Sequence, residues 1–343
     1  MQLIVLGLNH KTAPVEIRER FNFSQDRTVR VLRRLRNNDN LNEAVLLSTC
    51  NRTELYMVLE DPAAGLHFIR TLLRHLAGEQ YKPDYFYNLT GINCVRHLFK
   101  VASSLDSLII GEGQILSQIK NAYHLSRSCG MTDTLFNTLF NRAIAVGKRV
   151  RTETKIAYSS VSVSSAAVDL AIDVVGDLTK ANILVLGAGR MSELTARHLI
   201  DKGAKTIFVS NRNLSHAQEL AEKFNGTAIP YNEFMHQAIT SDIIITSTGA
   251  PHYVITEQGV RDIIPKRSGK PLILVDIAVP RDVDPLVGDI EGVTLYNIDD
   301  LEGVVDMNKN FRSSEAKVAE AIIDEEITAL KERLRYLTMR PVM

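Results

Sequence analysis

Residues 182–192 read Asn182-Ile183-Leu184-Val185-Leu186-Gly187-Ala188-Gly189-Arg190-Met191-Ser192, an apolar run that leads directly into a turn with two glycines. The apolar run predicts a buried strand, and the residues from the turn to about Ile200 predict a helix. Glycine at such a turn lets the backbone approach a pyrophosphate, and the helix N-terminus attracts the anion. Residues 187–192 are therefore predicted to bind a dinucleotide, although Ser192 replaces the third glycine of the usual pattern.

Strands and helices alternate on the C-terminal side of this turn. Apolar runs at 206–210, 242–246 and 272–276 predict strands, and 215–224 predicts one of the helices between them. This alternation is typical of a parallel, doubly wound sheet. The sequence therefore predicts an α/β Rossmann domain over residues 179–296.

The end of the second predicted strand indicates which dinucleotide binds. A site for NAD usually places Asp or Glu about 20 residues after the turn, where the carboxylate binds the ribose 2′-hydroxyl. The chain instead has Ser210-Asn211-Arg212. A carboxylate would repel a 2′-phosphate, whereas arginine can pair with it, so we expect NADPH. The alternative is that Arg212 only caps the loop.

Residues 1–156 show a different order of elements. The order is strand, helix, two strands, helix, strand, which is the α+β, ferredoxin-like pattern, and three helices follow. The predicted strands are 2–8, 43–48, 54–59 and 85–89; the predicted helices are 24–36, 63–76, 93–102, 115–126 and 134–152. A linker passing into a helix is expected over 157–178. Residues 297–343 are expected to hold a long amphipathic helix with an apolar face formed by Val318, Ile322, Leu330, Leu334 and Leu337.

A cysteine lies at the turn between two of these strands, in Leu47-Ser48-Thr49-Cys50-Asn51-Arg52-Thr53-Glu54. The thiolate is the nucleophilic form of cysteine, and the nearby Arg52 favours it. The alternative is a buried, inert thiol, the commonest fate of a free cysteine. Cys94 and Cys129 lie in or beside predicted helices and lack this setting.

A nucleophilic cysteine together with a nicotinamide cofactor suggests reduction of an acyl thioester. The polar loop over 103–114 is dense in groups that bind carboxylates and amines, so it is either a substrate site or a simple helix connector. His97 stands just before this loop and is either a proton donor or a histidine on a helix surface.

Composition limits the other possibilities. Three cysteines without a CxxC pair argue against a disulfide framework and a cysteine-based metal site. No signal peptide or apolar run of about 18 residues is apparent, so we expect a cytoplasmic protein and no contact with a membrane. The net charge is zero, but residues 1–155 are basic and residues 156–343 are acidic. This asymmetry either indicates a polyanion partner for the first half or reflects ordinary variation of helix surfaces.

Several segments together resemble the glutamyl-tRNA reductase family. They are Gly7-Leu8-Asn9-His10-Lys11-Thr12-Ala13-Pro14, Ser48-Thr49-Cys50-Asn51-Arg52, His97-Leu98-Phe99-Lys100-Val101-Ala102, Gly111-Glu112-Gly113-Gln114-Ile115-Leu116, Lys148-Arg149-Val150-Arg151-Thr152-Glu153-Thr154 and Asp276-Ile277-Ala278-Val279-Pro280-Arg281-Asp282. The family reduces glutamyl-tRNA(Glu) to glutamate-1-semialdehyde, the first step of 5-aminolevulinate and porphyrin synthesis. The resemblance implies that Cys50 forms a glutamyl thioester, that tRNA leaves, and that NADPH reduces the thioester.

The resemblance also assigns roles to individual residues. His97 matches a histidine that is important for activity, and residues 187–192 match the nucleotide turn. Arg52 is expected to hold the substrate carboxylate, while Glu54 is expected either to hold that arginine or to accept the substrate amine. The positions that match substrate contacts are Thr49, Asn51, Arg52, Ser107, Glu112, Gly113, Gln114 and Gln118.

The chain departs from the family in three respects. Ser104, Gly113 and Ser117 stand where glycine, proline and glycine are common; on sequence alone the first and last are one small residue in place of another, while Gly113 loosens a loop at the substrate site. Arg190 stands where an acidic residue is common and is expected to add affinity for NADP. Family members usually continue past the long helix into a dimerisation domain, so residues 297–343 are expected to be a shortened form of this region and the expected homodimer is in question. A semialdehyde aminomutase is a further partner that the resemblance implies.

Two other functions remain open from the sequence. One is an NADP-dependent dehydrogenase of a small metabolite, which would need no cysteine and no tRNA. The other is a non-catalytic protein that senses NADP or binds RNA. The tRNA reductase is the leading hypothesis because the cysteine turn and the nucleotide turn occur in one chain.

Overall fold

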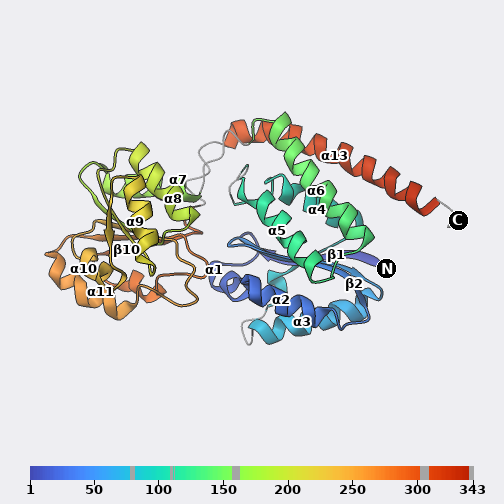
Figure 1. Ribbon diagram of the computed structural model, residues 1–343, viewed down its shortest axis with the longest axis horizontal. Coiled ribbons are helices and arrows are strands. Elements are labelled where there is room, and N and C mark those ends of the chain that lie inside the picture. Colours follow the sequence, from blue (N-terminus) through green and yellow to red (C-terminus); the bar gives the residue numbers. More distant parts are fainter. Residues whose placement is uncertain (78–81, 109–110, 112, 157–162, 302–308, 340–343) are drawn as a thin grey trace. The chain divides into compact units, whose positions relative to one another are not determined.

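The computed structural model describes residues 1–77, 82–108, 111, 113–156, 163–301 and 309–339 (Figure 1). Its contacts divide the chain into two compact units. The first combines Met1–Ser160 with Asn308–Met343, and the second is Val161–Met307. Residues 157–162 of the predicted linker and helix (157–178) lie outside the described residues.

The first unit is built on a four-stranded antiparallel sheet. Its strands lie in the order β2-β3-β1-β4, which is the order of a ferredoxin-like sheet, so this prediction is confirmed. Asn9 pairs with Arg52 and Gly7 pairs with Glu54. The strands are β1 (Gln2–Asn9), β2 (Leu41–Ser48), β3 (Arg52–Leu59) and β4 (Tyr87–Thr90).

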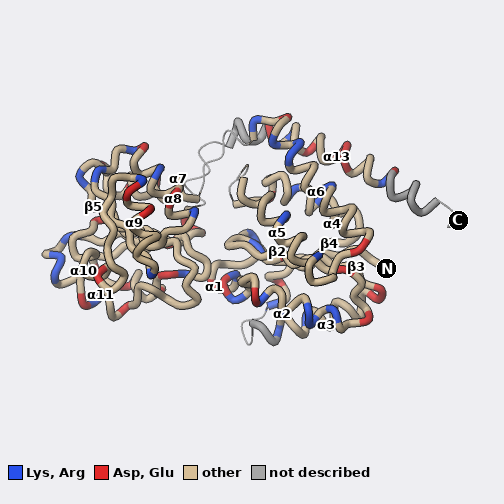
Figure 2. Tube along the Cα trace, viewed as in Figure 1, with Lys and Arg blue, Asp and Glu red and all other residues tan. Residues whose placement is uncertain are grey.

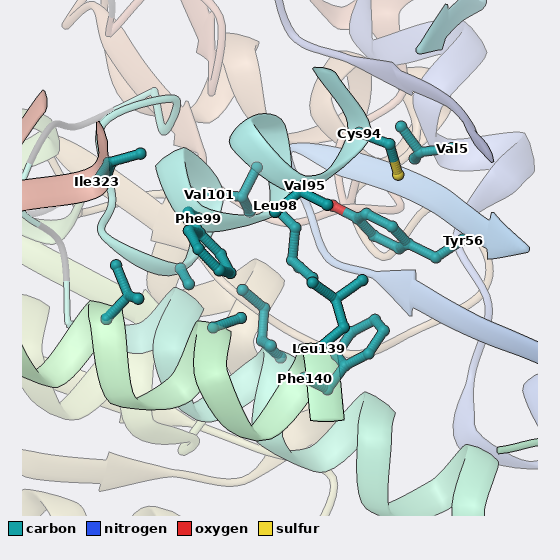
Figure 3. Packing of buried hydrophobic residues seen from close by; sticks show 14 of the residues in the cluster. Val5, Tyr56, Cys94, Val95, Leu98, Phe99, Val101, Leu139, Phe140 and Ile323 are labelled. Carbon is teal, nitrogen blue, oxygen red and sulfur yellow. The ribbon is translucent and has the colours of Figure 1, made fainter. Parts of the chain in front are cut away.

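Helices cover both faces of this sheet, because apolar side chains of β1, β2 and β3 alternate between two cores. α2 (Gln25–Leu35) and α3 (Pro62–Ala77) contribute to one core, together with the short α1 (Val15–Arg18). Ser24 caps α2 as its sequence predicts, accepting a hydrogen bond from the Arg27 backbone. The second core is formed with α4 (Gly91–Ala102), α5 (Gln114–Ser128) and α6 (Thr134–Glu153), and Figure 3 shows Tyr56, Phe99 and Phe140 within it.

The long helix α13 (Lys309–Met339) completes the second core of the first unit. Its buried apolar side chains include Ala319, Ile322, Ile323, Ile327 and Leu330, a spacing of three and four residues. Figure 3 shows Ile323 reaching this core. The predicted apolar face was wrong at Val318, which is 48% exposed, because the packed stripe runs one residue further along the helix.

Ion pairs also join α13 to the helices beneath it. Arg96 pairs with Asp324 and Lys100 pairs with Glu320, both from α4. Arg149 of α6 contacts two glutamates, with 2.8 Å to Glu325 and 2.9 Å to Glu326, and Arg142 pairs with Glu326 as well. The basic side chains of this face are therefore neutralised within the unit.

The second unit is a six-stranded sheet, and every strand pair in it is parallel. The strand order is β10-β9-β8-β5-β6-β7. Strands β6 and β7 are added on one side of β5, and β8, β9 and β10 are added on its other side, as in a doubly wound nucleotide-binding sheet. The predicted Rossmann architecture is confirmed. The strands are β5 (Asn182–Leu186), β6 (Thr206–Ser210), β7 (Thr227–Ile229), β8 (Ile243–Thr246), β9 (Leu272–Asp276) and β10 (Val293–Asn297).

Strand β10 and two helices were missed from the sequence. β10 is a five-residue edge strand whose side chains are mostly half buried, so it lacks the long apolar run that marked β5 and β9. The helices are α7 (Val163–Val175), α8 (Arg190–Asp201), α9 (Leu214–Lys223) and the two short, unpredicted helices α10 (Phe234–Ala238) and α11 (Glu257–Ile263). Within the described ranges, no helix is both long and apolar enough to cross a bilayer.

Candidate active site

Cys50 lies at the turn that joins β2 to β3. Thr49 shapes this turn, because its hydroxyl oxygen accepts hydrogen bonds from the backbone N–H groups of Asn51 (3.2 Å) and Arg52 (3.1 Å). The Thr49 N–H donates to the carbonyl oxygen of Arg52 at 2.8 Å. Arg18 donates to the carbonyl oxygen of Cys50 at 3.4 Å, and Cys50 itself is half buried. The turn therefore fixes the backbone of the cysteine while leaving its side chain partly accessible.

Next to this turn, a fully buried carboxylate collects four hydrogen-bond donors. Oε1 of Glu54 accepts from Arg52 at 2.6 Å and from the Tyr87 hydroxyl at 2.5 Å, and it lies 2.8 Å from Nε2 of His97. Oε2 accepts from the Tyr56 hydroxyl at 2.6 Å. A carboxylate can only accept, so Nε2 of His97 carries the hydrogen of this contact. Glu54 thus connects Arg52 to His97.

The ionised form of Glu54 is strongly favoured by these neighbours. Burial alone would raise the pKa of this carboxyl, but the charge of Arg52, the charge of His97 and the hydrogen bonds from His97 and Tyr56 outweigh burial and lower the pKa. Burial and the negative charge of Glu54 raise the pKa of both Tyr56 and Tyr87. Each tyrosine therefore remains a hydrogen-bond donor to the carboxylate.

Arg52 holds a second acidic residue, Asp106, from the loop after α4. Its guanidinium lies 3.3 Å from the Asp106 carboxylate and also donates to the Asp106 carbonyl oxygen. Burial would raise the pKa of Asp106, but the charge of Arg52 and the hydrogen bond from Lys11 lower it. The Arg52 side chain is only 2% exposed. Of the two sequence-based roles for Glu54, the geometry favours that of holding Arg52.

His10 lies next to the cysteine turn, because its backbone N–H donates to the Asn51 carbonyl at 3.0 Å. Cations near the turn affect the pKa of its imidazole. Burial is the main factor that lowers the pKa of His10 to about 4, and the charges of Arg52, Lys11 and Arg18 add to it. The imidazole is therefore neutral at physiological pH. Three cations, Arg52, Lys11 and Arg18, thus lie near the cysteine turn, and nearby cations favour a thiolate.

The other two cysteines differ from Cys50. Cys94 is fully buried in the core of Figure 3, where burial and the negative charge of Glu54 raise the pKa of its thiol. A buried thiol with a raised pKa is a poor nucleophile. Cys129 follows the last residue of α5 and packs against the opposite core.

The other expected substrate residues lie around the loop between α4 and α5. Ser107 is half buried beside Asp106, and Gly113 and Gln114 stand at the start of α5. A Cβ added at Gly113 would approach the Arg151 guanidinium to 3.0 Å, so this glycine keeps room for Arg151. Gln118 lines a cavity along the edge strand β2. Glu112 lies outside the described residues.

The nucleotide turn lies where β5 ends, beside the end of β8, which is the switch point of the sheet. Gly187 has a φ of +114°, and an added Cβ would lie 2.8 Å from the Ser192 hydroxyl and 2.9 Å from the Ser247 carbonyl. Gly189 is different, because an added Cβ would meet nothing within 4 Å. Ser192 is buried, and its hydroxyl lies 2.6 Å from that of Ser247. Ser192 therefore packs the helix against the sheet and leaves the space over Gly189 open.

A cavity of about 250 Å³ adjoins this turn. No carboxylate lines it, while Arg212 does, with its guanidinium 5.9 Å from the centre of the Tyr231 ring and 3.1 Å from the ring nitrogen of His252. Ala188, Arg190 and Met191 lie outside the cavity lining, and Arg190 is exposed at the first position of α8. The lining residues are Leu186, Gly187, Ser210, Asn211, Arg212, Tyr231, Thr248, Gly249 and Ala250. The open space over Gly189 and this lining, with one arginine and no carboxylate, fit a nicotinamide dinucleotide.

Two known protein families match the two units of the chain separately. Residues 6–154 match the family model described as Glutamyl-tRNAGlu reductase, N-terminal domain, and residues 169–304 match the one described as Shikimate / quinate 5-dehydrogenase. The chain is 45% identical over 346 residues to glutamyl-tRNA reductase of Trichlorobacter lovleyi, covering 100% of this chain and 80% of that protein. The chain belongs to the glutamyl-tRNA reductase family.

Other members of the glutamyl-tRNA reductase family support this assignment. The protein from Syntrophotalea carbinolica is 46% identical, over 100% of this chain and 78% of its own length. The solved structure of glutamyl-tRNA reductase from Methanopyrus kandleri matches with a TM-score of 0.52 and 36% identity, over 98% of this chain and 81% of that chain. The match of the second unit to a dehydrogenase model indicates a nicotinamide cofactor.

Ser104, which departs from the glutamyl-tRNA reductase pattern, has a backbone conformation that the sequence did not reveal. Ser104 has a φ of +58°, a left-handed conformation that glycine adopts without strain. The exchange of glycine for serine at this position is therefore more than one small residue for another. The backbone there is specialised, since the Ser104 carbonyl accepts from the Gly111 N–H at 3.2 Å and closes the substrate loop.

The sequence missed several side chains of this reductase site. Tyr87, Asp106 and His10 contact the Arg52–Glu54 pair or the cysteine turn, yet none carried a predicted role. His10 lay in one of the segments that carried the family resemblance, so the signal for it was available. Tyr87 gave none, because only the pairing of β1 with β4 brings it to Glu54. No cluster of three or more potential metal ligands occurs in the parts of the chain that the structure describes.

Proposed function

We propose that this protein reduces glutamyl-tRNA(Glu) to glutamate-1-semialdehyde with release of tRNA, through a thioester on Cys50. The observation that carries the proposal is a half-buried cysteine at a turn fixed by hydrogen bonds and flanked by Arg18 and Arg52, in a chain that also has a nicotinamide-binding unit. Residues 1–156 would bind glutamyl-tRNA, and residues 179–296 would bind NADPH. We place residues 157–178 between them as a linker and helix, and residues 297–343 as the C-terminal helical region.

The proposed reaction uses the residues of the first unit for the acyl transfer. Sγ of Cys50 attacks the ester carbonyl carbon, the bond from that carbon to the ribose oxygen breaks, and the tRNA leaves with a free hydroxyl. NADPH supplies the hydride that reduces the resulting thioester. The thiolate of Cys50 then leaves as the aldehyde forms, and the cysteine is restored.

Arg52 and His97 have distinct proposed roles in this reaction. The side-chain carboxylate of the glutamyl group would compete with the Asp106 carboxylate for the Arg52 guanidinium. Glu54 would keep Arg52 charged and in place. His97 is 12% exposed and its Nε2 is held by Glu54, so its other ring nitrogen is the candidate for proton transfer. Asn51, whose buried Oδ1 has no hydrogen-bond partner among the described residues, is a candidate acceptor for the substrate amine.

A single-turnover experiment tests the proposal directly. Purified protein is mixed with glutamyl-tRNA(Glu) labelled in the glutamyl group, first without NADPH. We expect the label to appear on Cys50 as an acid-stable, hydroxylamine-labile thioester, and to be released as aldehyde when NADPH is added. Aldehyde formation without labelled Cys50 would contradict the thioester mechanism.

The nucleotide turn offers a matched pair of glycine substitutions. Gly187→Ala should lower the free energy of unfolding by at least about 1 kcal/mol, because of the positive φ and the close contacts. Gly189→Ala should leave the melting temperature nearly unchanged, since its Cβ meets no protein atom, yet weaken NADPH binding about tenfold. Thermal unfolding and NADPH titration check both. Equal NADPH affinity in Gly189→Ala and wild type would exclude this turn as the phosphate site.

Arg212 is proposed to select NADPH over NADH. Arg212→Glu removes a cation from the 2′-phosphate position and adds a repelling charge, so the NADPH/NADH preference in kcat/KM should fall about 100-fold. Lys205→Glu is the control, because Lys205 is exposed at the other end of β6. An unchanged preference in Arg212→Glu would mean that Arg212 only caps its loop.

Two partners remain proposals from the family. We propose a homodimer and an association with a semialdehyde aminomutase that receives the aldehyde. Sedimentation analysis tests the first, and a trapping assay for free aldehyde in the presence of the aminomutase tests the second.

A further inference from the structure

A groove of about 530 Å³ runs along the open edge of the first unit's sheet, between α2 and α5. Its volume lies within the range of about 300–1,000 Å³ that is typical of small-molecule sites. The wall is rich in neutral polar side chains and contains no carboxylate. The lining residues are Phe23, Gln25, Thr28, Leu46, Ser48, Gln118, Asn121, Ala122, His124, Leu125 and Ser128.

The two helices beside this groove are basic, and Figure 2 marks Lys and Arg along the chain in blue. α2 carries four arginines and one acidic residue, Asp26, while α5 carries Lys120 and Arg127 and no acidic residue. Burial and the charge of Arg30 lower the pKa of Arg27, as expected for a cation without a nearby carboxylate. Among the described residues, the exposed cations here form no ion pair, in contrast to the cations beneath α13. They are Arg20, Arg30, Arg33, Arg34, Arg36, Lys120 and Arg127.

The groove begins next to the proposed nucleophile. Ser48, at the end of β2, lines it and is only two residues from Cys50, a span of at most about 7 Å. Gln118, one of the residues expected to contact the substrate, lies on the opposite wall. At the other end of α5, the Arg36 guanidinium lies 3.7 Å from the position of an added Cβ at Gly130. The groove therefore leads from the cysteine turn toward exposed cations.

We infer that this groove binds the unpaired 3′-terminal nucleotides of the tRNA. The inference rests on the proposed function, because an ester that reaches Cys50 brings its terminal ribose to the turn that begins at Ser48, where the groove starts. Neutral polar side chains such as Asn121 and Gln118 suit the hydrogen-bonding edges of bases, and the His124 ring offers a stacking surface. The cations of α2 and α5 suit the phosphates that follow.

The inference gives a reason for the excess of basic residues in positions 1–155, which would bind the phosphates of the tRNA. Four basic side chains of α4 and α6, Arg96, Lys100, Arg142 and Arg149, are already paired with acidic residues of α13, so they offer little to a polyanion. The side formed by α2 and α5 offers cations without an ion pair among the described residues, and a groove lined by Ser48, two residues from the nucleophile. Binding should consequently fall steeply with salt concentration.

The test changes the charge of one exposed groove residue and of one matched residue elsewhere. Asn121 is exposed on α5 and lines the groove, and Gln218 is exposed on α9 of the second unit. Four variants are compared with wild type: Asn121→Asp, Asn121→Lys, Gln218→Glu and Gln218→Lys. Each is titrated with uncharged tRNA(Glu), either complete or lacking its last three nucleotides, at one fixed salt concentration. KM and kcat are measured with glutamyl-tRNA(Glu).

We expect loss of the three nucleotides to weaken binding to wild type about tenfold. Asn121→Asp should weaken binding of the complete tRNA by about the same factor and be insensitive to the truncation, while Asn121→Lys should bind more tightly. The effect should fall on KM, and both Gln218 variants should match wild type. Thermal unfolding confirms that the Asn121 variants are folded.

Two results would overturn the inference: equal binding of complete and truncated tRNA by wild type, or Asn121 variants that bind as wild type does. Either result would leave the proposed function intact if wild type still converts glutamyl-tRNA to aldehyde. Failure of wild type to form aldehyde would instead refute the proposed function, whatever the affinity for tRNA.

Discussion

Cys50→Ser should lose aldehyde formation from glutamyl-tRNA by at least about a thousandfold in kcat. A serine hydroxyl at this turn is a far weaker nucleophile than a thiolate, and the oxygen ester that it would form is a poorer hydride acceptor than a thioester. The fold should be unaffected, because Thr49 and not Cys50 holds the turn. The measurement is steady-state NADPH oxidation together with direct detection of the aldehyde.

Cys129→Ser is the matched control for this experiment. Cys129 is also half buried in the first unit, but it contributes to no proposed step. It should retain full activity. A Cys50→Ser protein that reduces glutamyl-tRNA at the wild-type rate would remove the thioester from the mechanism and favour a dehydrogenase that needs no cysteine.

Glu54→Gln should affect both stability and activity. The change leaves the buried Arg52 guanidinium without its closest counter-charge, and one oxygen acceptor becomes an amide donor that faces other donors. Breaking a buried charge pair in this way costs about 3–5 kcal/mol. We also expect kcat to fall at least about 100-fold, since Arg52 and His97 both lose their position.

The pH dependence of stability provides a separate test of Glu54. Its pKa in the folded protein is below the ordinary value of 4.5, so below about pH 4.5 the unfolded chain binds more protons than the folded protein. The stabilisation is therefore present at neutral pH and is lost as the pH falls below this value. Urea unfolding between pH 3 and pH 7 should show this loss in wild type, and the curve of Glu54→Gln should be flatter.

Glu43→Gln is the matched control for Glu54→Gln. Glu43 is also a buried glutamate in the same sheet, but within the described ranges it accepts only from backbone N–H groups at the start of α6. Its replacement should cost less stability and leave activity intact. Equal losses in the two variants would mean that the charge pairing of Glu54 has no special importance.

The sequence predicted features that depend on neighbours along the chain. The turn after β5, the succession of strands and helices along the chain and the placement of Cys50 between two strands all follow from local patterns of apolar and turn residues. It was harder to predict which face of α13 packs against α4 and α6. Val318 and Ala319 each continue a plausible apolar stripe, and only the helices beneath α13 decide that Ala319 is buried and Val318 exposed.

The Glu54 cluster could not be predicted for a related reason. Arg52, Glu54 and Tyr56 alternate along one strand, so their common face is readable from the sequence. Tyr87, His97 and Asp106 reach them from a separate strand, a helix and a loop, and these contacts depend on the register of β4 and the position of α4. Chemistry of this kind is visible only once distant segments have been brought together.

The membership of α13 in the first unit also affects how the protein folds during synthesis. The second unit is continuous in sequence and can fold as soon as its last strand leaves the ribosome. The first unit cannot complete its core at that stage, because Ala319, Ile323 and Ile327 have not yet left the ribosome. Until α13 emerges, the surface that it covers on α4 and α6 stays open to water. The nascent catalytic unit is therefore the part of the chain that we expect to need protection by a chaperone.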